Sequence, residues 1–185
     1  MGVGAFYQNY DGLRLKIDIE MKRGKWQAGS LPRSYKHRLP FIHAHSFLYA
    51  IDGFGKFLEV IASEDGLPQA VCSIRDEFDR ALPSLRKIRN SALHIEDRSR
   101  GFGTAVQARK KEKMKLQPIK NRMIDAPHGA LMLSNLNGNK LGYTIDDGSY
   151  QEIEISPLTL NIAKEALQKL IDTFTWNSPS LHRPD

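Results

Sequence analysis

The sequence predicts a mainly α-helical protein, an up-and-down helical bundle that carries an inserted three-stranded antiparallel β-meander. In several long stretches apolar residues recur at spacings of three and four, which places them on one face of a helix. After residue 130 the spacing changes to two, and the pairs Asn-Gly and Asp-Gly separate the alternating segments. Such pairs between alternating segments are strong signals for hairpin turns, so we expect the meander at residues 130–155.

Length and composition favour one globular domain over residues 1–185. The chain has 185 residues, of which 41% are hydrophobic and 26% charged, which is an ordinary globular composition. No apolar run approaches the roughly 18 residues that a membrane span needs. Cys72 has no second cysteine with which to form a disulfide, and this fits a reducing compartment. We therefore expect a cytoplasmic protein with no membrane association.

The N-terminal part predicts two helices joined by a loop. Residues 5–27 are loosely periodic and are weakened as a helix by Gly12. Two prolines and several basic residues make residues 29–40 a loop. Residues 41–62 form the clearest helix. Its apolar positions are Phe41, Phe47, Leu48, Ile51, Phe54, Leu58 and Ile61.

Two histidines on this helix, His43 and His45, suggest a metal site at first sight. Residues two apart on a helix point about 200° from each other and cannot hold one ion. We interpret them as one surface and one half-buried histidine, and we expect no metal or other cofactor in this protein.

The next helix begins at Pro68 after the turn at residues 63–66 and runs to a polar motif near residue 94. Pro83 interrupts it, because proline lacks the backbone N–H and crowds the carbonyl of residue 79. We expect a kink there that re-aims the segment carrying the motif. The inward positions are Val71, Ile74, Phe78, Leu82, Leu85 and Ile88.

Positive charge is concentrated in residues 98–122. This segment has nine Lys or Arg against the single Glu112, a net charge of +8 within a chain of net charge +6. The remaining residues therefore carry a net −2. We expect a basic loop, either a short helix or disordered, that draws a polyanion toward the motif before it. An equally weighted alternative is a solvated loop with no specific role. Its candidate nucleic-acid-binding residues are Arg98, Arg100, Arg109, Lys110, Lys111, Lys113 and Lys115.

The last part of the chain predicts three strands and one helix. The strands are expected at residues 130–136, 140–145 and 150–155. Ser156 then caps the final helix and Pro157 opens it, with an apolar stripe that reaches Phe174. The stripe consists of Leu158, Ile162, Ala166, Leu167, Leu170, Ile171 and Phe174. Residues 177–185 are a tail.

The polar motif is the stretch Arg89-Asn90-Ser91-Ala92-Leu93-His94. On an ideal helix Leu85, Ile88, Ala92 and Ile95 share the core face, and the other side is polar. We expect Arg89, Asn90 and His94 on this polar side, with Leu93 exposed among them. Arg89 and His94 lie about 140° apart on such a helix, so one subunit brings them together only if the helix ends or kinks between them. Leu93 would suit a contact between two copies.

This string resembles the RxxxxH signature of the HEPN superfamily, which includes small helical ribonucleases of toxin, defence and RNA-processing systems. The similarity covers roughly residues 40–98 and the last helix. It implies a homodimer in which two motifs form one metal-independent site, with Arg89, Asn90 and His94 as catalytic residues. It also implies an RNA substrate and products with a 2′,3′-cyclic phosphate and a 5′-hydroxyl.

The chemistry fits these residue types. RNA cleavage without a metal needs a base for the 2′-hydroxyl proton, positive charge on the phosphorane and an acid for the leaving oxygen. Histidine can serve as base or acid near neutral pH, and arginine offers a fixed fork of donors to phosphate. Asn90 would orient the imidazole or donate to a phosphate oxygen.

Three interpretations stay open, of which the ribonuclease is the first. Arg89 could pair only with Glu96 or Asp97, while His94 caps a helix end and bonds a carbonyl. The chain would then be a non-catalytic HEPN-like module that binds nucleic acid or protein. A third interpretation pairs it with a nucleotidyltransferase-like protein in a toxin–antitoxin system.

Overall fold

The computed structural model describes residues 19–30 and 33–175 of the 185-residue chain. The chain divides into two compact units, residues 1–43 and 44–185, which are described separately. In the first unit residues 19–27 are helical, and the four-residue helix α2 (Arg33–Lys36) lies within the expected loop. The expected helix at residues 5–18 and the tail at residues 177–185 lie outside the described residues.

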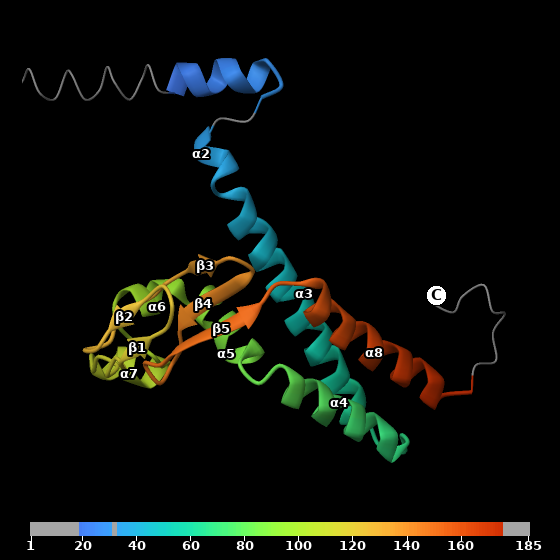
Figure 1. Ribbon diagram of the computed structural model, residues 1–185. Coiled ribbons are helices and arrows are strands. Elements are labelled where there is room, and N and C mark those ends of the chain that lie inside the picture. The colour runs from blue at the N-terminus through green and yellow to red at the C-terminus, as the bar shows by residue number, and fades with distance from the viewer. Residues whose placement is uncertain (1–18, 31–32, 176–185) are drawn as a thin grey trace, which may run out of the picture. The chain divides into compact units, whose positions relative to one another are not determined.

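The second unit is mainly α-helical and contains a three-stranded β-meander, as the sequence predicts (Figure 1). Helix α3 (Leu39–Ala62) begins in the first unit and supplies much of the core. Helices α4 (Gln69–Ala81) and α8 (Pro157–Thr173) pack on each other. Phe54 of α3 and Phe78 of α4 meet edge to face, with their ring centroids 5.4 Å apart. Among the described residues, none of the helices combines the length and apolar character that a membrane span requires.

Pro83 ends one helix rather than bending it. Helix α4 stops at Ala81, and a separate helix α5 (Leu85–Leu93) begins after Pro83 and carries the polar motif. The expected kinked helix is therefore two helices, because proline within the junction supplies no hydrogen bond that could continue the first one. His94 ends α5 and precedes the short helix α6 (Ile95–Ser99).

The meander is formed by β3 (Asn135–Asn137), β4 (Lys140–Thr144) and β5 (Tyr150–Glu154). Its register pairs Asn137 with Lys140 and Leu141 with Ile153. The turn glycines Gly138 and Gly148 have φ of +60° and +83°, a conformation that glycine adopts without strain. Helix α5 packs against β4 and β5, so the motif helix provides the surface that three short strands need.

The expected basic loop is partly regular. It contains helix α7 (Ala105–Lys110), where Thr104 and Gln107 form a capping box, and strand β1 (Ile119–Lys120). Strand β1 pairs with β2 (Asp125–Ala126) in a second small sheet that the alternation pattern did not predict. Two apolar side chains from this segment, Met114 and Ile119, are buried.

At the last helix the cap and the proline are confirmed. The side chain of Ser156 accepts a hydrogen bond from the backbone N–H of Thr159, and Pro157 stands in the first turn of α8. The predicted apolar stripe is only partly buried, since Leu158 is exposed. In the core, buried side chains from α3, α4, α5, β4, β5 and α8 form one cluster.

Candidate functional site

The motif arginine lies in the interior of the second unit. Arg89 is 8% exposed, which contradicts the prediction that it belongs to the polar outer side of the helix. Its Nε donates to Oδ2 of Asp52 at 2.6 Å, and Asp52 is itself buried on α3. Neither Glu96 nor Asp97, the partners considered from the sequence, takes this role. A buried guanidinium needs a carboxylate partner because an unpaired buried charge is very costly.

Asp52 was missed by sequence reasoning. Its Oδ1 also accepts a hydrogen bond from Nε of Arg86 at 2.8 Å, and Nζ of Lys56 lies 3.8 Å from its Oδ2. The available signal was its position four residues after Leu48 and directly after Ile51, which places this carboxylate on the side of α3 that carries the core residues. Such a residue in a core position predicts a buried cationic partner.

The motif histidine lies at the surface. The His94 side chain is 60% exposed, and its Nδ1 lies 3.8 Å from Oε1 of Glu96. Its backbone N–H still donates to the carbonyl of Asn90 at 3.0 Å, and α5 ends at Leu93 because the backbone of His94, with φ of −102° and ψ of 43°, is no longer helical. Among the described residues no contact joins Arg89 and His94: the guanidinium binds Asp52 in the interior and the imidazole lies near Glu96 at the surface. The half-buried Asn90 side chain makes no hydrogen bond to His94 among the described residues.

The two apolar residues flanking His94 are both exposed. Leu93 is 49% exposed, which confirms the prediction that it stands among polar groups. Ile95 is 44% exposed, so its expected place on the core face is wrong. Because the helix ends at Leu93, the ideal 100° per residue no longer relates Ile95 to Ile88.

Arg98 differs from the other candidate nucleic-acid-binding residues because it is buried, with 4% exposure. Its Nε donates to Oγ of Ser91 at 3.1 Å, and one terminal nitrogen donates to the carbonyls of Phe102 and Gly103. Burial lowers the pKa of this guanidinium, and Asp146, Asp97 and Glu96 act in the opposite direction. Arg98 therefore ties the motif helix to the start of the basic segment and does not belong to its outer surface.

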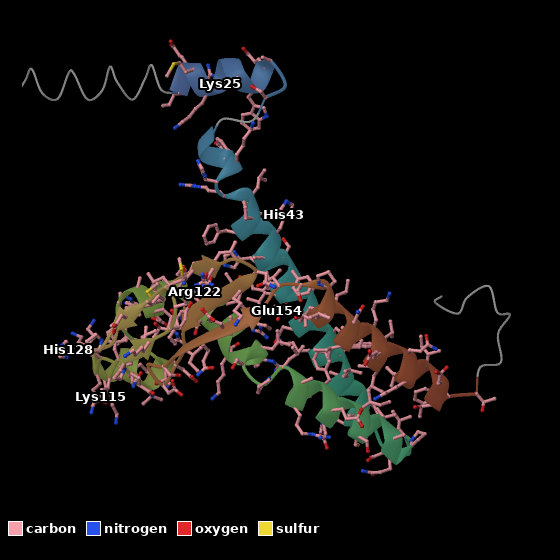
Figure 2. The ribbon with its side chains drawn as sticks, in the orientation of Figure 1. Lys25, His43, Lys115, Arg122, His128 and Glu154 are labelled. Atoms are coloured by element: carbon pink, nitrogen blue, oxygen red, sulfur yellow. The ribbon has the colours of Figure 1, made fainter. Side chains whose placement is uncertain are left out.

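The other six candidates are exposed. Arg100 pairs with Asp97 at 2.5 Å, and its guanidinium carbon lies 5.5 Å from the centre of the Phe102 ring. The ammonium of Lys113 lies 4.3 Å from the same ring centre and donates to the carbonyl of Arg100. Figure 2 shows Lys115 and His128 pointing away from the ribbon where α7, β1 and β2 lie. The remaining exposed candidates are Arg109, Lys110 and Lys111.

Two cavities lie beside the α4–α5 junction, and no motif residue lines either of them. One of about 420 Å³ lies between α3, α4 and α5 and is lined by Asp52 and Arg86 as well as Phe78. The other, of about 250 Å³, lies between the α4–α5 junction, β5 and α8. The connection between the motif and the larger cavity is therefore Asp52, which faces the cavity and also holds Arg89.

Two groups of histidines are relevant to metal binding: His43 and His45 on α3, and His94 with its acidic neighbours. His43 is exposed and His45 half-buried, as expected, and the His45 ring contacts the hydroxyl of Tyr143. Burial raises the pKa of that phenol. In the described part of the chain His94, Glu96 and Asp97 each place a potential ligand atom within 4.8 Å of the others. We assign no metal to this group, since Asp97 is already paired with Arg100.

Comparison of the chain with protein-family models, curated proteins and solved structures gives no match. The class of protein defined here is thus a mainly helical fold with a β-meander packed on its motif helix. The resemblance to the HEPN superfamily stays a prediction based on the motif itself.

Proposed function

We propose that this protein is a metal-independent, HEPN-like endoribonuclease that acts as a homodimer in the cytoplasm, in a toxin or defence setting. The observation that supports this most directly is the contrast between the two motif side chains. Arg89 is fixed in the interior by Asp52, whereas His94 is exposed where the helix ends. A fixed cation and an accessible proton-transfer group are the two kinds of group that phosphodiester cleavage needs.

In the proposed reaction a 2′-oxygen of RNA attacks the neighbouring phosphorus and the bond to the 5′-oxygen breaks. One His94 accepts the 2′-hydroxyl proton, and a second His94 from the partner copy donates a proton to the leaving oxygen. Arg89 stabilises the negative charge on the phosphorane. Asn90 donates to a phosphate oxygen. The products carry a 2′,3′-cyclic phosphate and a 5′-hydroxyl.

The exposed basic residues support an RNA substrate. Positive side chains on α7 and in the extended segment after it follow closely on the motif helix in the chain, and Arg98 links the two regions through buried hydrogen bonds. Phosphate contacts from such residues supply affinity without sequence selectivity, and the affinity falls as salt rises. We propose Arg100, Arg109, Lys110, Lys111, Lys113 and Lys115 as this surface, without Arg98.

The test is cleavage of a labelled RNA by the full chain and by His94→Ala, in the presence of a chelator. We expect wild-type activity to survive chelation and the variant to lose about 100-fold or more, in the range that general acid–base groups contribute. His128→Ala is a matched control, because it removes another exposed histidine near the basic segment. Wild-type protein that does not cleave RNA, or a variant that cleaves normally, contradicts the proposal.

A second candidate is a non-catalytic HEPN-like module that binds nucleic acid or a protein, including a nucleotidyltransferase-like antitoxin. The observation in its favour is that neither described cavity is lined by Arg89, Asn90 or His94. Retained RNA affinity without cleavage in the wild-type protein selects this module. Co-purification of a nucleotidyltransferase-like protein selects the antitoxin pairing.

A further inference from the structure

Asp52 is the centre of a charged cluster that connects α3 to the motif helix. Each of its oxygens accepts a hydrogen bond from a different arginine on α5: Oδ2 from Arg89 at 2.6 Å and Oδ1 from Arg86 at 2.8 Å. The carboxylate side chain is only 4% exposed, so water does not compete strongly for it. Hydrogen bonds of this charge-assisted kind are among the strongest in proteins.

Asp52 binds the Arg89 guanidinium through its Nε atom only. The Arg89 side chain is 10% exposed, and within the described residues its single hydrogen bond leaves from Nε. No buried side-chain nitrogen or oxygen in this part of the chain lacks a partner, so the terminal nitrogens of Arg89 retain some access to solvent. Because a guanidinium is planar and rigid, fixing Nε restricts the directions of the two terminal nitrogens.

The ion pairs around Asp52 involve more cations than carboxylates. Three cations, Lys56, Arg86 and Arg89, lie within ion-pair distance of this one carboxylate. Glu59 supplies a second carboxylate, which accepts from Arg86 at 3.2 Å. This cluster thus carries one positive charge in excess. The adjacent cavity of about 420 Å³ does not, because three carboxylates and two arginines line it, and Arg89 is not among its lining residues.

We infer that Asp52 is the positioning residue for the motif arginine: it aims the terminal nitrogens of Arg89 at one phosphate group of an RNA strand. This inference rests on the proposed function and extends it to a residue outside the motif. Asp52 itself does not touch the RNA. Arg86, held on the other oxygen of the same carboxylate, supplies a second cation on the side of the cavity.

Whether RNA affinity rises or falls when Asp52 is substituted distinguishes a positioning role from a purely electrostatic one. Asp52→Asn removes a negative charge, and by charge alone it should bind RNA more tightly. If Asp52 positions Arg89, the variant should instead bind more weakly, because the guanidinium loses its fixed direction. Loss of one well-directed, charge-assisted contact predicts about tenfold weaker binding.

The experiment measures the dissociation constant of a 2′-O-methyl RNA oligonucleotide, which cannot form the cyclic phosphate and is therefore not cleaved. The full chain is compared with Asp52→Asn at a temperature well below both melting points. Asp79→Asn is the matched control, because Asp79 also lines the cavity but accepts no hydrogen bond from Arg86 or Arg89. We expect unchanged or slightly tighter binding by this control.

A second variant covers the case in which Asp52→Asn does not fold. Arg89→Lys keeps the charge opposite Asp52 but lacks the planar fork, so it should also bind about tenfold more weakly. If both variants fold, combining them should add little to either single effect.

The inference is overturned if Asp52→Asn or Arg89→Lys binds as tightly as the wild type, or if the wild type does not bind the oligonucleotide. Cleavage of unmodified RNA by the same wild-type preparation is recorded separately. Wild-type protein that binds without cleaving removes the nuclease proposal but leaves the Asp52 result intact. Wild-type protein that cleaves, with unaffected binding by the variants, removes only the inference.

Discussion

Substituting Arg98 tests the most specific structural claim about the basic segment. Arg98→Met keeps the length and apolar stem of the side chain but removes its donors. Three acceptors then lose their partner: Oγ of Ser91 and the carbonyls of Phe102 and Gly103. All three residues are buried, so water cannot replace the guanidinium without rearranging the loop.

The loop has little freedom to rearrange. A side-chain carbon added at Gly103 would lie 2.0 Å from the carbonyl oxygen of Asp146, so the backbone is already packed closely there. A buried acceptor left without a donor costs about 1–3 kcal/mol. Taking about 1 kcal/mol for each of the three acceptors predicts a loss of about 3 kcal/mol in the free energy of unfolding. For a unit of this size that corresponds to a melting point lower by roughly 10 °C.

The assay is urea denaturation followed by circular dichroism, with Arg100→Met as the control. Arg100 is an exposed neighbour, and its loss should change the free energy of unfolding by less than about 0.5 kcal/mol. If Arg98 were a surface residue that bound nucleic acid, Arg98→Met would lower RNA affinity and leave stability unchanged. A stability loss below about 0.5 kcal/mol would refute the claim that Arg98 acts through buried hydrogen bonds.

Three further predictions concern the core, a turn and one phenol. Ile88→Ala, at a fully buried position, should lower the free energy of unfolding by about 3 kcal/mol in urea denaturation. Gly148→Ala should lower the free energy of unfolding by more than about 2 kcal/mol, because the added carbon would lie 2.1 Å from the Lys115 carbonyl oxygen. At Gly138 an added carbon meets no atom, so Gly138→Ala should lower the free energy of unfolding by only about 1 kcal/mol. Burial is the main cause that raises the pKa of Tyr150 to about 12. Its contribution to stability is therefore complete below pH of about 10, the usual tyrosine value, and declines as pH rises toward about 12.

The glycine and tyrosine predictions each have a clear contrary result. Equal costs for the two glycine substitutions would mean that the β4–β5 turn does not lie against the segment near Lys115. Ultraviolet titration of Tyr150→Phe against the wild type should show the loss of one phenol that ionises near pH 12. A lost phenol that ionises near pH 10 would mean that Tyr150 is accessible to water.

The sequence determined the class of fold because its signals are local. Spacings of three and four define α3 and α8, the Ser156-Pro157 pair defines the start of α8, and glycine pairs define the turns of the meander. Each of these depends on neighbours within a few residues, so no tertiary contact is needed to recognise them. The same local reasoning was wrong at Pro83, where it predicted a kink and the chain begins a new helix.

Only the tertiary structure decided the environment of the arginines. A helical wheel assigns charged residues to solvent, yet Arg89 and Arg98 are both buried. Arg89 is paired with Asp52, which lies 37 residues earlier in the chain. Arg98 donates to the backbone carbonyls of the loop that follows it. Burying a guanidinium is favourable only where such partners already stand in place. The sequence by itself therefore identified the motif and its residue types, while long-range pairing determined which of its side chains is fixed inside and which, His94, faces outward.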